Sequence, residues 1–351
     1  MVARRKPQAV SAAPDVTLQI NLCAGDLAYG KQIVAALAAA HRSDVREVVV
    51  VADACRPQST PLLHAPGRFA EPAFSERLAR LRTLCATLQS DGLVQRVEWL
   101  EPDTTALRTL NYRYSGLATP CSHDHLGHAF SAYFLGWECA RTRYVAHFDA
   151  DILLWQHPGF SWLHTACVAL ARDETLLAAS PRIAPPADGV AMVRVEDPGS
   201  GWLPTWPLVP APGGWRSPWL STRCHLMDRE RLARVLPIGG SATHRRAASL
   251  ERLLAPLCTT RFFTDSGLGR RLARRVPAWP LPPEVLLHAH AHARGFSCLY
   301  LDDPRAWFIH PDTKPDRFLR LLPRLLDGVA HGEVPPAQRG VSGVQFAAWE
   351  S

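Results

Sequence analysis

The sequence predicts an α/β fold in which a mostly parallel central sheet is flanked by helices. Short apolar runs of strand type alternate with longer segments of helical periodicity along the first half of the chain. Hydrophobic residues make up 47% of the chain and charged residues 20%, which is enough apolar material for a large buried core. Both observations favour one folded α/β protein over a disordered chain.

The first hundred residues contain three candidate strands and two candidate helices. Residues 17–23 alternate as a first strand, and a helix is expected around residues 33–38. Residues 47–53 form a continuous apolar run that ends in an acid, which is typical of a buried parallel strand. A helix near 75–89 precedes a third strand at 93–99. This order predicts the first βαβ units of the sheet.

A helix near 125–141 leads into an apolar strand at 144–154. The segment 181–219 is crowded with Pro, Gly and Trp, as in many binding loops. We expect one or two of its tryptophans to contact a ligand ring: Trp202, Trp206, Trp215 or Trp219. The remaining expected elements are strands at 219–227 and 296–301, the latter followed by the apolar segment 306–311, and helices near 228–235, 247–255, 265–275 and 315–327.

Charge and cysteine content restrict the partners. The formal charge of +7 and pI near 9.1 favour anionic ligands. Basic residues are spread along the chain without a dense block, so nucleic acid is not the expected partner, and membrane contact is peripheral at most. Nine scattered cysteines without a CxxC pair, and no apolar run of membrane-spanning length, favour a soluble cytoplasmic protein.

Two carboxylates stand one residue apart where the strand beginning at Tyr144 ends. Side chains alternate along a strand, so Asp149 and Asp151 are expected on the same face, about 7 Å apart. Like charges at the end of an apolar strand need a counter-charge, and hard oxygen ligands suit Mg²⁺ or Mn²⁺. The pair therefore predicts a metal that holds a diphosphate. The alternative is that Asp149 caps a turn and Asp151 is solvated.

The chain resembles nucleotide-sugar glycosyltransferases of the GT-A fold, especially glycosyltransferase family 2. The residues that keep the spacing of that family's helix and acidic strand are Ala132, Gly136, Ala140, Tyr144, Val145, Asp149 and Asp151. The family's Arg-Asn pair is replaced by Tyr133 and Phe134, and Ala52 and Thr264 replace acids that are common in the family. The resemblance implies a Rossmann-like GT-A sheet with a C-terminal acceptor-binding half.

The resemblance also implies roles for residues outside the acidic pair. Asp265 matches the family's catalytic base, and Arg271 is a candidate phosphate contact; a helix cap and a solvated helix face are the alternatives. His310 resembles a C-terminal histidine that completes the metal or diphosphate site. Asp53 is expected to accept a hydrogen bond from a nucleobase, with uridine favoured; its alternative role is a turn cap.

The expected function is therefore transfer of a sugar from a nucleotide-diphosphate sugar, with UDP-sugars favoured, to a hydroxyl acceptor, with inversion and with Mn²⁺ or Mg²⁺. Residues 15–330 are expected to form one domain, with 15–155 binding the nucleotide sugar and 156–330 binding the acceptor. Residues 1–14 are expected to be a flexible tail and 331–351 a C-terminal tail. The alternatives are a sugar-phosphate nucleotidyltransferase and a catalytically inactive nucleotide-sugar-binding protein.

Two clusters of histidines contain residue types that zinc binds. One contains Cys121, His123, His125 and His128, and the other contains His288, His290 and His292. Structural zinc needs four convergent ligands, and neither cluster has a supporting cysteine pair. We therefore do not expect a zinc site at either.

Overall fold

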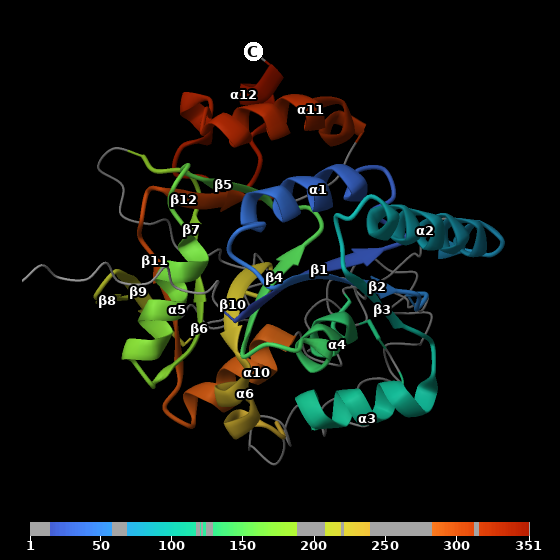
Figure 1. The fold of residues 1–351 in the computed structure, drawn as a ribbon, viewed down its shortest axis with the longest axis horizontal. Helices are drawn as coiled ribbons and strands as arrows, with labels where there is room; N and C mark the ends of the chain where they lie inside the picture. The colour runs from blue at the N-terminus through green and yellow to red at the C-terminus, as the bar shows by residue number, and fades with distance from the viewer. Residues whose placement is uncertain are drawn as a thin grey trace, which may run out of the picture.

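The computed structural model describes residues 15–57, 69–116, 120, 122–123, 129–187, 208–218, 221–238, 283–311 and 316–350. Its centre is a nine-stranded sheet with the order β3-β2-β1-β4-β10-β6-β11-β9-β8 (Figure 1). These strands are β1 (Val16–Cys23), β2 (Glu47–Asp53), β3 (Arg96–Leu100), β4 (Tyr144–Asp149), β6 (Leu176–Ser180), β8 (Val209–Ala211), β9 (Gly214–Ser217), β10 (Cys224–Asp228) and β11 (Ser297–Leu301).

Seven of these strands run in one direction, and β10 and β9 run against them. The fold-class prediction of a mostly parallel α/β sheet is therefore confirmed. A second sheet of three strands has the order β5-β12-β7. It consists of β5 (Leu153–Gln156), β7 (Arg182–Ile183) and β12 (Ala306–Ile309).

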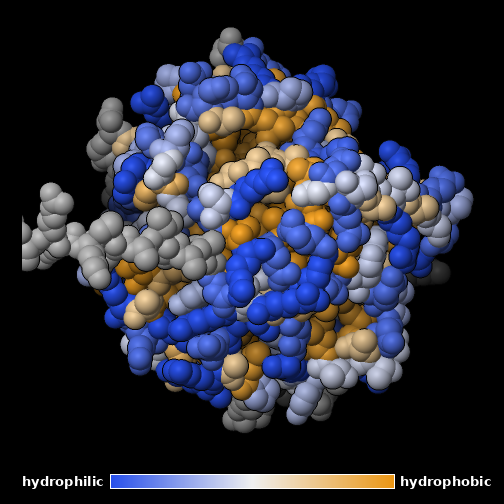
Figure 2. Space-filling view, in the orientation of Figure 1, coloured by the Kyte–Doolittle hydropathy of each residue, from blue (hydrophilic) through white to orange (hydrophobic). Residues whose placement is uncertain are grey.

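Helices cover both faces of the large sheet. The core on one face contains residues of α1 (Gly30–His41), α2 (Ala73–Ser90), α5 (Trp162–Arg172) and α11 (Asp316–His331). The core on the other face contains residues of α3 (Thr104–Ser115), α4 (Ser131–Cys139), α6 (Arg229–Val235) and α10 (Pro283–His292). Apolar surface is visible between α11 and α1 in Figure 2. The rings of Tyr29, which precedes α1, and Phe318 of α11 pack with their centroids 5.5 Å apart.

Residues 331–350 do not simply trail away from the domain. They contain α12 (Phe346–Glu350), which packs on α11, and Trp349 is buried. The side-chain amide of Gln338 organises this segment: it donates to Val341 O, and its Oε1 accepts hydrogen bonds from Gln345 N and Trp349 Nε1. A fully buried amide with several partners is a structural anchor, which corrects our expectation of a tail.

None of the helices in the described ranges combines the length and apolar character that a membrane-spanning segment needs.

His41 ends α1 in the apolar core and is neutral. Its Nδ1 donates to Leu37 O (2.8 Å), because a carbonyl can only accept, and its Nε2 accepts from Trp162 Nε1 (2.9 Å), because an indole can only donate. Burial lowers the pKa of His41, and the hydrogen bond to Leu37 O opposes this only in part. In the unfolded chain the same side chain binds a proton below about pH 6.5.

We therefore predict that acid destabilises the fold through His41. The unfolded state binds more protons than the folded state below pH 6.5, so stability is complete above that pH and falls as the pH decreases. The free energy of unfolding should therefore be lower at pH 5.5 than at pH 7.5. Urea unfolding of wild type and of His41→Leu at both pH values measures it. The variant should lose less stability on acidification, and an identical loss in both proteins would contradict the prediction.

Candidate functional site

Acidic residues gather at the edge of the sheet where the parallel strands end. Asp53 ends β2 and lies beside Cys23 at the end of β1. Asp149 ends β4 and lies beside Asn21 of β1. Asp26 follows in the turn after β1. Ligands of open α/β sheets bind at this carboxyl edge, so it is the candidate site.

The two acids of the predicted metal pair are not on one continuous strand. The main chain turns after Asp149, where Ile152 N–H donates to Asp149 O (3.2 Å), and Asp151 lies in that turn. β5 then starts at Leu153 in the second sheet. The expected strand at 144–154 is therefore two strands with a corner between them. Both acids stand at that corner and are partly exposed, so both can reach a ligand at the edge.

Asp149 is held by side chains of two elements. Tyr133 of α4 donates its hydroxyl hydrogen to Asp149 Oδ1 (2.7 Å), and His147 Nε2 lies 3.3 Å from the same oxygen. His147 is fully buried, and burial lowers its pKa to about 3, so its ring is neutral. Tyr133 stands where the resemblance leads one to expect an arginine. The tyrosine that replaces the arginine orients the Asp149 carboxylate through its hydroxyl.

Another acid, Asp26, is buried at the same edge of the sheet. Its Oδ2 accepts from Cys23 N–H (2.8 Å), and its Oδ1 accepts from the hydroxyl of Tyr29. Burial raises the pKa of Tyr29 above its usual range, and the negative charges of Asp26 and Asp151 raise it further. The edge thus carries concentrated negative charge. Asp26 is not among the residues predicted from the sequence, although an acid three residues after a strand is a signal for such a turn.

Asp53 is almost completely buried. Its Oδ1 accepts a hydrogen bond from Cys55 N–H (2.8 Å), so Asp53 caps the turn, as the alternative interpretation of the sequence predicts. Its Oδ2 lies 3.5 Å from His123 Nε2. Burial raises the pKa of Asp53, and the nearby His123 opposes that rise. His123 thus occupies one side of this buried carboxylate. Recognition of uridine by Asp53 remains a prediction.

His310 follows β12 and is fixed by the C-terminal segment. Its main-chain N–H donates to Ser342 O (3.0 Å), and its main-chain carbonyl accepts from Val344 N–H (2.9 Å). The guanidinium of Arg223 lies against the imidazole ring, with Nη1 3.2 Å from Nδ1. The main-chain carbonyl of Arg223 accepts a hydrogen bond from the main-chain N–H of Asp149 (3.0 Å). The fold thus links His310 to Asp149 through Arg223, which the sequence analysis missed.

The remaining predicted positions are not all described. Asp265 and Arg271 lie outside the described residues, as do Cys121, His125, His128, Trp202, Trp206 and Trp219. His288 and His290 are buried on α10. Trp215 of β9 donates from Nε1 to Asp302 Oδ2 (3.0 Å). Within the described ranges, no three His, Cys, Asp or Glu side chains are grouped closely enough to hold a metal by themselves.

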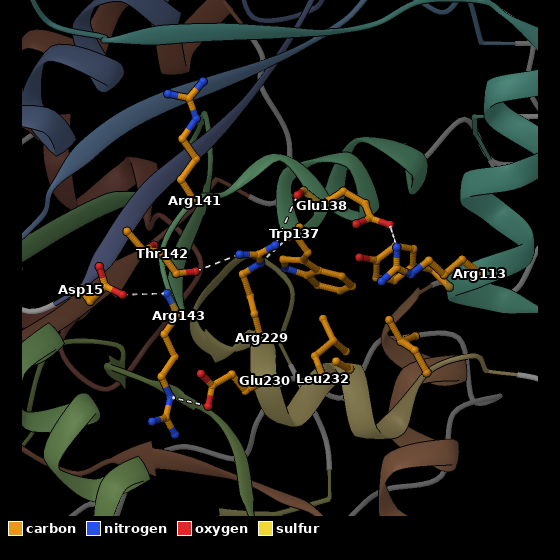
Figure 3. Close-up of a pocket in the computed structure, with 13 residues that line it drawn as sticks. Asp15, Arg113, Trp137, Glu138, Arg141, Thr142, Arg143, Arg229, Glu230 and Leu232 are labelled. Atoms are coloured by element: carbon orange, nitrogen blue, oxygen red, sulfur yellow. Dashed lines mark hydrogen bonds and ion pairs between the residues drawn. The ribbon is translucent and has the colours of Figure 1, made fainter.

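A cavity of about 400 Å³ lies at the opposite edge of the sheet, where β1 and β4 begin (Figure 3). Three of the arginines that line it have partners within the protein. Arg229 donates from Nε to Trp137 O (2.7 Å) and so caps the end of α4, Arg143 pairs with Asp228 (2.8 Å), and Arg113 pairs with Glu138. Because these charges already have partners, the cavity is a structural feature and not the candidate site.

No protein-family model matches the chain, and no curated protein matches its sequence. Among solved structures, it is similar to the mannosyltransferase PcManGT from Pyrobaculum calidifontis in complex with GDP-Man and Mn²⁺, at 17% identity and a TM-score of 0.37. That match covers 90% of this chain, which spans only 65% of the mannosyltransferase. It is also similar to the galactosyltransferase LgtC in complex with donor and acceptor sugar analogues, at 12% identity, 81% and 72% coverage and a TM-score of 0.35. These neighbours are glycosyltransferases. Because both TM-scores are below 0.5, the candidate site is defined by the residues of this chain alone.

Proposed function

We propose that this protein is a metal-dependent glycosyltransferase that moves a sugar from a nucleotide-diphosphate sugar to a hydroxyl acceptor with inversion. One observation carries the proposal: two partly exposed acids, Asp149 and Asp151, stand at the carboxyl edge of the sheet near Arg223 and His310. Partly exposed acids at a ligand-binding edge suit a divalent metal together with a diphosphate.

The donor set fits Mn²⁺ or Mg²⁺. Carboxylate oxygens of Asp149 and Asp151 would hold the ion, and His310 would add a nitrogen ligand. The negative charge that raises the pKa of Tyr29 also favours a cation at this corner. The described residues hold no preformed group of three such ligands, so the His310 ring would have to move toward the two acids to join them. Phosphate and water would supply the remaining ligands. When bound, such an ion stabilises the charge that develops on the leaving diphosphate.

The chain's own residues then divide the remaining work. Arg223 would turn from the His310 ring toward the diphosphate, where a guanidinium can make two charge-assisted hydrogen bonds. Arg271 would make a further phosphate contact. Asp53 would accept a hydrogen bond from the nucleobase, with UDP favoured. Asp265 would remove the proton from the attacking acceptor hydroxyl, and direct attack on the sugar inverts its anomeric centre.

The proposal predicts that a nucleoside diphosphate stabilises the protein only when a divalent ion is present. At a ligand concentration of 100 Kd the free energy of unfolding should rise by about 2.7 kcal/mol, and the melting temperature should rise with it. UDP and GDP with and without Mn²⁺ are the samples, and UMP with Mn²⁺ is the matched control without a diphosphate. Release of nucleoside diphosphate from the corresponding sugar donors is the second readout.

A stabilisation by diphosphates that does not depend on Mn²⁺ would contradict the metal. Equal stabilisation by UMP would contradict the diphosphate. Diphosphate binding without any donor hydrolysis or transfer across an acceptor panel would favour the inactive binding protein instead.

A further inference from the structure

A row of polar side chains crosses the interior of the sheet beneath the candidate site. Strand register places Gln19 of β1 beside His147 of β4, and His147 beside His225 of β10. All three are fully buried. A buried polar side chain destabilises a fold unless it is hydrogen-bonded, so such a row across a sheet calls for a reason beyond packing.

Two members of the row, Gln19 and His147, belong to a hydrogen-bonded chain that ends at Asp149. Gln19 lies 2.5 Å from Asn21 Oδ1 through its Nε2 and 2.5 Å from His147 Nδ1 through its Oε1. His147 Nε2 then lies 3.3 Å from Asp149 Oδ1. The hydrogen-bonded chain therefore passes from strand β1 to strand β4 and reaches the Asp149 carboxylate from the interior of the sheet.

The chain has a preferred direction. Amide oxygen and nitrogen occupy equivalent places, so both amides can be turned without changing a distance. With Gln19 donating to Nδ1, the neutral ring of His147 carries its hydrogen on Nε2 and donates it to the Asp149 carboxylate. The opposite direction places the Nε2 lone pair against a negative oxygen, which is unfavourable. The first direction is therefore the one that satisfies every group.

Helix α4 seals this chain from solvent. The ring of Tyr133 lies on His147, with centroids 4.7 Å apart, and Trp137 meets His225 at 5.9 Å. Tyr133 also donates to the oxygen of Asp149 that His147 reaches. Two donors from different elements thus fix one oxygen of the acid and with it the plane of the carboxylate.

We propose that His147 is a positioning residue that holds Asp149 in the orientation needed to bind a divalent cation. The inference rests on the proposed function, because it assigns a partner to the acid that function uses. Residues that orient a metal-binding carboxylate typically change metal affinity about 10- to 100-fold when they are removed. His225 stacks on His147 at 5.2 Å but does not contact Asp149, so it serves as the matched buried control.

The test compares two substitutions of nearly equal polarity. In His147→Gln the side-chain NH₂ reaches the place of Nε2 and can still donate to Asp149, whereas in His147→Asn it reaches only the place of Nδ1. Mn²⁺ affinity in the presence of UDP, measured by electron paramagnetic resonance, is the readout. We expect affinity close to wild type for His147→Gln and a loss of about 10- to 100-fold for His147→Asn. Melting temperatures are measured alongside.

Further variants keep the test decisive if His147→Asn does not fold. Tyr133→Phe removes the other hydrogen bond to the same oxygen and should lower Mn²⁺ affinity, whereas His225→Asn should lower the melting temperature and leave the affinity unchanged. Wild-type affinity in both His147→Asn and Tyr133→Phe would overturn the positioning role alone. An equal loss in His225→Asn would show that the row is only structural. A wild-type protein that does not bind Mn²⁺ with UDP would overturn the proposed function as well.

Discussion

Asp149→Asn is expected to abolish Mn²⁺-dependent release of nucleoside diphosphate from the donor while leaving the fold intact. Asparagine keeps the shape of the side chain and an oxygen that can accept from Tyr133, which donates to Asp149 at 2.7 Å. It lacks the negative charge that a divalent cation needs. Loss of that charge should lower kcat/KM by on the order of 10³-fold, because the ion acts on charge that develops as the diphosphate leaves.

The control for this prediction is an acid away from the candidate site. Asp91 follows α2, is exposed, and pairs with Lys31 at 3.0 Å. Asp91→Asn should keep wild-type activity, and both variants should melt within about 2 °C of wild type, as expected for changes at exposed or partly exposed side chains. Full activity in Asp149→Asn would remove Asp149 from the site. A large fall in its melting temperature would show that the acid is structural.

Gly136→Ala is expected to destabilise the protein although alanine is the better helix former. A Cβ at this position of α4 would lie 2.6 Å from Gln19 Oε1 and 2.7 Å from its Nε2. Gln19 cannot simply move aside, because it holds both Asn21 and His147. Overpacking of a core costs about 1–3 kcal/mol, whereas the same substitution in an open helix stabilises by about 1 kcal/mol. Urea unfolding measures which effect is larger.

A double-mutant cycle tests the physical reason. Gln19→Ala removes the atoms that the new Cβ would meet, at the cost of the hydrogen bonds of Gln19. In that background Gly136→Ala should be neutral or stabilising, so the two changes should be strongly non-additive, by at least about 1 kcal/mol. Additive effects would mean that the close approach of α4 to Gln19 is not what requires a glycine here.

The elements that the sequence predicted well are those with a strong local pattern. Residues 47–53 are a strand with those same bounds, because a continuous apolar run that is covered on both faces leaves little choice. The helix expected near 125–141 begins only at Ser131. The helix α5 and the strand β6 were not predicted. For α5 the signal was present, because its buried residues Trp162, Leu163, Ala166 and Leu170 follow a helical spacing.

The candidate site could be predicted only where its residues are neighbours along the chain. Only one residue separates Asp149 from Asp151, so their pairing was visible in the sequence. The turn after Asp149, which ends the strand before Asp151, was not visible. Arg223 reaches the same edge because β10 runs antiparallel beside β4, which brings the start of one strand to the end of the other. Strand order is a property of long-range packing, and the periodicity of residues 219–227 contains no information about it.

The most direct test of the account is the position of Mn²⁺ in crystals grown with UDP, located by its anomalous scattering. We expect one strong peak within coordination distance of the Asp149 and Asp151 carboxylates, with the diphosphate beside it and Arg223 turned toward the phosphates. A peak elsewhere, or a diphosphate bound away from the carboxyl edge of β4, would contradict the account.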